Sequence, residues 1–138
     1  MGFGKTWTVL GYFPQALKVK AGTTVTFVNK APVEVHNVVF GPKKYILGLQ
    51  KTTDLFPTGP KSPNQTSPFL VYGSEPKGQY SFDGANHGNG FLSTPLNAGA
   101  PGQGLSQSWA VTFTKPGTYS YFCWIHGPEM SGKIIVTG

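Results

Sequence analysis

Residues 116–136 read PGTYSYFCWIHGPEMSGKIIV, and this stretch decides both the fold and the chemistry that we expect of the chain. Tyr119, Tyr121 and Cys123 share one face of its first half, which is the period-two pattern of a half-buried β-strand. The stretch from residue 132 to residue 137 is β-branched and predicts the final strand. Between the two strands stands a short connection whose side chains can bind a metal ion.

Four side chains with soft or borderline donor atoms stand out, three of them in or beside this connection. They are His36, Cys123, His126 and Met130. Two imidazoles and one thiolate with a weak axial thioether form the donor set that suits copper cycling between two oxidation states. Hard-oxygen metals would call for carboxylates, and the chain has only five. His36 has to come from a neighbouring strand, which a β-sandwich allows.

Period-two runs recur outside the deciding stretch and predict further strands. They are Ala16–Lys20, Thr23–Asn29, Val33–Phe40 and the alternating positions Trp109, Val111 and Phe113. No sustained 3.6-residue period of useful length is seen. We therefore predict an all-β sandwich or barrel, in one domain over residues 1–138.

The middle of the chain, residues 41–107, has a different amino-acid composition. It holds 11 glycines and 8 prolines, the majority of each in the whole chain. Three short apolar runs, Tyr45–Leu49, Phe69–Tyr72 and Gly90–Leu92, predict brief strands or a loop packed over the framework. We interpret the segment as a long Gly/Pro-rich insertion between the strand of His36 and the C-terminal strands.

Composition narrows the classes of function. All 11 cationic residues are lysine, against 5 acidic residues, so the net charge is +6. Without arginine the chain lacks the bidentate fork that reads phosphates and guanine edges, and we expect no nucleic-acid partner. No apolar run reaches the roughly 18 residues of a membrane span, and the first residues do not resemble a signal peptide. A single cysteine excludes an internal disulfide.

The chain resembles the cupredoxins, the small blue copper proteins, and within them the plastocyanin, pseudoazurin, amicyanin and auracyanin group. The likeness rests on residues 36–40 (HNVVF), residues 116–123 (PGTYSYFC), His126, Met130 and residues 132–136 (GKIIV). It implies a Greek-key β-sandwich that holds one type 1 copper, bound by His36, Cys123, His126 and, as the long axial ligand, Met130. It also implies that the backbone N–H of Asn37 donates to the cysteine sulfur.

Two positions depart from the family pattern. Three residues separate His126 from Met130, which is intermediate between the loops of familiar relatives and affects the axial bond. Trp124 stands where relatives often carry a small hydroxyl residue, so we expect the side-chain link from this position to Asn37 to be absent.

The resemblance implies a one-electron carrier and not an enzyme, located in the periplasm or at the cell surface, with any leader absent from this sequence. The implied partners are redox proteins: a cytochrome, a membrane electron-transfer complex or a terminal reductase. We expect a monomer. A copper-trafficking or storage module is the alternative. Three histidines in total cannot supply a trinuclear copper cluster besides the type 1 site, which argues against an oxidase.

Several side chains have a plainer interpretation beside the functional one. Met130 could be core packing, and Glu129 could replace it as a harder axial ligand or complete a zinc site with Cys123, His36 and His126. His87 is interpreted as a solvated loop residue, with a second weak metal contact as the alternative. The scattered lysines are interpreted as a solvated face.

Overall fold

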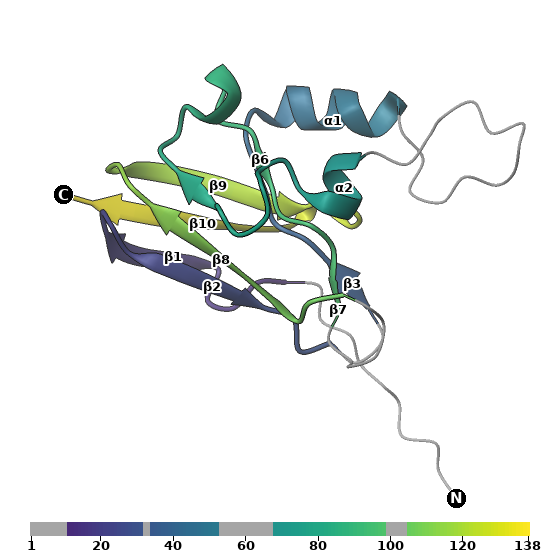
Figure 1. The fold of residues 1–138 in the computed structure, drawn as a ribbon, viewed down its shortest axis with the longest axis horizontal. Helices are drawn as coiled ribbons and strands as arrows, with labels where there is room; N and C mark the ends of the chain where they lie inside the picture. Colours follow the sequence, from purple (N-terminus) through teal and green to yellow (C-terminus); the bar gives the residue numbers. More distant parts are fainter. Residues whose placement is uncertain (1–10, 32–33, 53–67, 99–104) are drawn as a thin grey trace, which may run out of the picture.

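The molecule is a β-sandwich partly covered by two helices (Figure 1). The computed structural model describes residues 11–31, 34–52, 68–98 and 105–138. Its strands are β1 (Ala16–Lys20), β2 (Thr24–Val28), β3 (Val35–His36), β4 (Val39–Phe40), β5 (Ser81–Phe82), β6 (Leu92–Ser93), β7 (Asn97–Ala98), β8 (Ser108–Phe113), β9 (Gly117–Cys123) and β10 (Gly127–Thr137). One sheet has the order β1-β10-β9-β4-β6 and the other β2-β8-β5, while β3 pairs with β7 alone. The predicted all-β class is confirmed.

The core lies between the two larger sheets, where the predicted alternation places it. Val111 and Phe113 of β8 are fully buried, and Val25 and Phe27 of β2 pack against the same cluster. Phe40 is its centre, with ring contacts to four other aromatic side chains; these are Phe27, Phe82, Phe113 and Tyr121. Aromatic rings contribute large buried areas, so this cluster holds the sheets at a fixed separation.

The run predicted as a single strand over Val33–Phe40 is instead divided. The described part forms β3 and β4, which pair with different neighbours: β3 with β7, and β4 with β6 and β9. Between them the backbone N–H of Val38 donates to the hydroxyl of Thr94 at 2.9 Å and not to a neighbouring strand. A side chain distant in sequence thus satisfies the donor that a continuous strand would have used.

The middle segment contains helices where the apolar runs predicted brief strands or loops. Tyr45–Leu49 lies within α1 (Lys43–Thr52) and Phe69–Tyr72 within α2 (Pro68–Tyr72). Both pack on the outer face of the five-stranded sheet, in a second apolar cluster. Its buried members are Val39, Ile46, Leu70, Phe91, Phe122 and Trp124. Neither helix in the described ranges is long and apolar enough to cross a membrane.

The same segment also supplies framework strands. β6 pairs with β4, β5 with β8 and β7 with β3. The run Gly90–Leu92 meets its prediction in part, because β6 begins at Leu92. A one-turn 3-10 helix, η1 (Asn86–Gly88), connects β5 to β6. The described parts of residues 41–107 therefore both cover the sandwich and complete its sheets.

The last strand begins earlier than predicted, at Gly127 instead of Gly132. Its register against β9 shifts between Gly127 and Ser131, where β10 bulges. Met130 lies inside this bulge, not in a free loop, and its side chain is buried. The connection between β9 and β10 is a tight turn over residues 124–126.

Candidate metal centre

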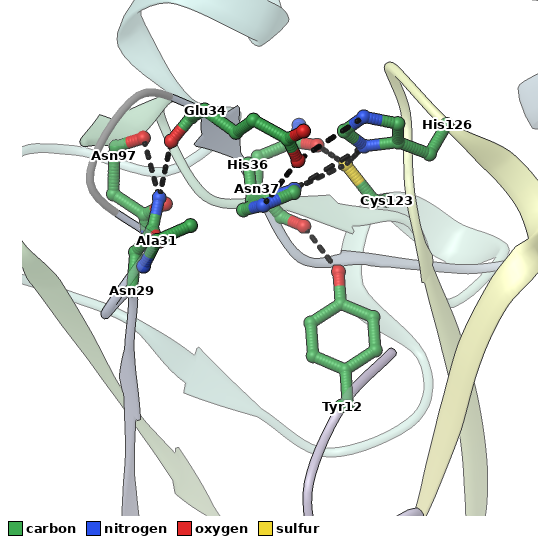
Figure 2. A network of polar contacts seen from close by, with 9 residues as sticks. All are labelled: Tyr12, Asn29, Ala31, Glu34, His36, Asn37, Asn97, Cys123 and His126. Carbon is green, nitrogen blue, oxygen red and sulfur yellow. Dashed lines mark hydrogen bonds and ion pairs between the residues drawn. The ribbon is translucent and has the colours of Figure 1, made fainter. Parts of the chain in front are cut away.

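Three of the predicted ligands meet at one end of the sandwich (Figure 2). His36 is the last residue of β3, Cys123 is the last residue of β9, and His126 closes the turn that follows. Within the described ranges they form the one group of histidine, cysteine and carboxylate side chains whose donor atoms converge as a metal site requires.

The donor atoms form a nearly equilateral triangle. The Nδ1 atoms of His36 and His126 are 3.2 Å apart, and the Cys123 sulfur lies 3.8 Å from the first and 3.5 Å from the second. The point equidistant from all three atoms lies about 2.0 Å from each, close to the distances at which imidazole and thiolate bind a small transition-metal ion. The three side chains thus fit a trigonal copper ion without rearrangement.

Burial shifts the pKa of two of these donors, His36 and Cys123. Desolvation, followed by the nearby His126, lowers the pKa of His36, while Glu34 opposes the change. Burial also raises the pKa of the Cys123 thiol, against three backbone donors that favour the thiolate. They are the N–H groups of Asn37, His126 and Ile125. A metal cation would add the attraction needed to displace the thiol proton.

The side chain of Asn37 contacts three residues around the centre, Cys123, Trp124 and Ser93. Its Oδ1 accepts the backbone N–H of Trp124 at 2.9 Å and lies 3.7 Å from the Cys123 sulfur. Its Nδ2 donates weakly to the Ser93 hydroxyl at 3.4 Å. The side-chain link expected to be lost at position 124 is therefore replaced by a backbone one. The backbone N–H of Asn37 also favours the thiolate of Cys123.

Met130 and Glu129 have opposite environments. Met130 is buried and lines the same cavity as His36 and Asn37, whereas the side chain of Glu129 is exposed. These positions favour Met130 over Glu129 as a fourth ligand, for copper or for zinc.

Two residues near the centre were missed from the sequence. The carboxylate of Glu34 approaches both histidines, and the Tyr12 hydroxyl donates to the backbone carbonyl of Asn37 at 2.6 Å (Figure 2). Glu34 could have been found, because residues i and i+2 of a strand share a face and His36 follows at that spacing. No signal in the sequence marks Tyr12, whose place depends on tertiary packing.

His87 lies outside the cluster. It sits in η1 with its side chain 45% exposed, and its Nε2 is 2.6 Å from a carboxylate oxygen of Glu75. Its partner is thus a carboxylate and not the metal donors, in agreement with its interpretation as a solvated loop residue.

Fold and donor set together define a copper-binding β-sandwich protein, and comparisons with known proteins agree. The family model described as copper binding proteins, plastocyanin/azurin family, matches residues 3–137. The chain belongs to this family. Chloroplastic plastocyanin from Physcomitrium patens is 29% identical over 129 residues, which cover 93% of this chain and 51% of that protein. The chain thus spans about half the length of this curated relative.

Solved structures of amicyanin mutants show the same fold. One in the oxidised state is 23% identical with a TM-score of 0.50, covering 94% of this chain and 76% of that one. Another, in the reduced state, is also 23% identical with a TM-score of 0.50, and the match covers 95% of this chain and 77% of that one. Membership of this family confirms that the chain is a cupredoxin and that its cofactor is copper. It also confirms the prediction that the chain is not an enzyme.

Proposed function

We propose that the chain is a one-electron carrier holding a single type 1 copper ion. His36, Cys123 and His126 would hold the ion, and Met130 would be the fourth ligand. The observation that carries this proposal is the triangle of two Nδ1 atoms and one sulfur, with sides of 3.2, 3.8 and 3.5 Å. When bound, the copper supplies the redox couple, cycling between Cu(I) and Cu(II).

The chain's part is to fix the ligands in advance. Cys123 is fully buried, and Asn37 contacts both its sulfur and the next peptide group. Because the sheets and these hydrogen bonds position the donors before the metal arrives, a change of copper oxidation state requires little movement of the protein. Small rearrangement is what fast electron transfer needs.

His126 is proposed as the point where electrons enter and leave. Its side chain is 21% exposed, against 11% for His36, and it stands in a turn and not within a sheet. An imidazole with one nitrogen on the metal and part of its ring at the surface provides a short path to a docked partner.

The partner is proposed to be another redox protein: a cytochrome, a membrane electron-transfer complex or a terminal reductase. The net charge of +6 supports a partner with an acidic face, since opposite charges accelerate association. We also propose that the chain acts as a monomer in the periplasm or at the cell surface, as the cupredoxin resemblance implies.

Titration of the apoprotein with Cu(II) tests the proposal. Optical and electron-paramagnetic-resonance spectra should show an intense thiolate-to-copper band at one ion per chain, bleached reversibly by a mild reductant. Cys123→Ser should lose the band, whereas His87→Ala, a change at a histidine outside the cluster, should keep it. A wild-type protein without the band, or an unchanged band in Cys123→Ser, would refute the proposal.

The trafficking alternative is separated by the rate of copper loss. A carrier with buried ligands should retain copper in the presence of a competing chelator, whereas a trafficking module should release it rapidly. Rapid release with no reversible redox cycle would favour trafficking.

A further inference from the structure

One carboxylate oxygen lies beside both imidazoles of the metal centre. The Oε2 atom of Glu34 is 3.5 Å from His36 Nε2 and 3.9 Å from His126 Nε2. This atom is buried and accepts no hydrogen bond from the described residues, although the Glu34 side chain as a whole is 28% exposed. In Figure 2 the carboxylate points toward both rings.

The two rings present to Glu34 the nitrogens that face away from the sulfur. Their Nδ1 atoms are the ones that meet Cys123, so the Nε2 atoms remain for other contacts. An imidazole that binds a metal through Nδ1 carries its proton on Nε2, and a carboxylate only accepts hydrogen bonds. A single carboxylate oxygen thus faces both N–H groups at ion-pair distance, 3.5 Å from one nitrogen and 3.9 Å from the other.

Within the part of the chain that the structure describes, no lysine side chain offsets the charge of Glu34. Among the described residues no lysine lies within 4.0 Å of its carboxylate, and the two ligand histidines are its ion-pair contacts. A negative charge next to two ligands attracts Cu(II) more strongly than Cu(I), because the interaction scales with the charge of the ion.

We propose that Glu34 is a positioning residue that orients both imidazoles through Nε2 and favours the oxidised copper. This inference rests on the proposed type 1 copper site and goes beyond its ligand set. Partners of this kind fix the ring orientation of metal-bound histidines and tune the metal's properties. The unusual feature here is that one carboxylate serves both ligand rings.

The test compares Glu34→Gln with Glu129→Gln in the copper-loaded protein. Both substitutions remove one negative charge at nearly constant volume, but the side chain of Glu129 is exposed. The readout is the reduction potential, measured by redox titration of the thiolate-to-copper band. Glu34→Gln should lower the preference for Cu(II) over Cu(I) about tenfold, which is a rise of about 59 mV in potential. Glu129→Gln should change that preference less than about twofold, as a solvated charge does.

Glu34→Ala tests the positioning role and serves if the glutamine variant does not fold. It should raise the potential as well and broaden the paramagnetic signal of Cu(II), because the rings lose their common acceptor. A wild-type potential in a folded Glu34→Gln or Glu34→Ala protein would overturn the inference. So would equal shifts in Glu34→Gln and Glu129→Gln. Failure of the copper site itself would already be seen as a missing band in the wild-type protein, so the two failures are distinguishable.

Discussion

The Nδ1 atoms of His36 and His126 lie 3.2 Å apart although 90 positions separate the two residues in the chain. One stands on a short strand paired only with β7, and the other in the turn between β9 and β10. The centre therefore exists only when the β3–β7 pair is docked against the end of β9.

The difference in exposure between the two histidines gives a first prediction. In His126→Gly the vacated place opens to solvent, so external imidazole should enter and restore the thiolate-to-copper band. In His36→Gly the vacated place is enclosed by the protein, because this side chain is only half as exposed, and the same imidazole concentration should restore much less of the band. Optical titration with imidazole in the presence of copper measures both. Equal rescue of the two variants would contradict the proposed exit at His126.

Asn37 is expected to be among the costliest polar side chains to remove. Asn37→Ala leaves the buried backbone N–H of Trp124 without its acceptor at 2.9 Å, and an unsatisfied buried donor costs about 1–3 kcal/mol. Ser93→Ala removes the weaker 3.4 Å partner on the other side of the same amide and should cost less, although Ser93 also contacts backbone carbonyls. Urea unfolding of the two apoproteins compares these costs. A smaller loss in Asn37→Ala than in Ser93→Ala would contradict this ranking.

Much of this centre could be predicted from the sequence because its donors have distinctive chemistry. Cys123 and His126 lie close together in the chain, so their pairing is a local property. The strands β8 and β9 were equally readable. In β8, for example, Val111 and Phe113 recur at every second position and form one buried face. Met130 was predicted as a ligand from its chemistry and stays a prediction, and its place in a β-bulge depends on how β10 pairs with β9.

The missed features depend on contacts distant in the sequence. α1 buries only Ile46 completely and carries Gly48 in its middle, so its short apolar pattern was no clearer than that of a strand. The break between β3 and β4 depends on the Thr94 hydroxyl, 56 positions beyond Val38. Such partners leave no trace in local periodicity.

Two substitutions in the outer helix α1 should change the free energy of unfolding in opposite directions. Ile46→Ala empties a fully buried site of the second apolar cluster and should cost about 2–5 kcal/mol of the free energy of unfolding. Gly48→Ala, two residues later, adds a methyl group that meets no atom within 4 Å and should stabilise by about 0.5–1 kcal/mol through helix propensity. Urea unfolding checks both. A destabilised Gly48→Ala protein would show that this position needs glycine for another reason.

The last prediction concerns alkaline pH. Burial raises the pKa of Tyr121 to about 12 and also raises the pKa of Tyr12, whereas phenols in the unfolded chain ionise near pH 10. The unfolded chain therefore loses protons that the folded protein retains. The contribution of these phenols to the free energy of unfolding should be fully present below pH 10 and should fall as the pH rises from 10 to 12. For Tyr121 the two-unit difference corresponds to roughly 3 kcal/mol.

Urea unfolding of the apoprotein at pH 8, 10 and 11 measures this fall. Tyr121→Phe should flatten the decline relative to the wild type, because the ionising hydroxyl is gone while the ring remains in the core. Tyr72→Phe is the matched control, since its side chain is exposed and the same hydroxyl is removed outside the core. It should follow the wild-type decline. Parallel declines in Tyr121→Phe and the wild type would show that the alkaline loss comes from other groups, because the buried phenol would then contribute nothing to the pH dependence.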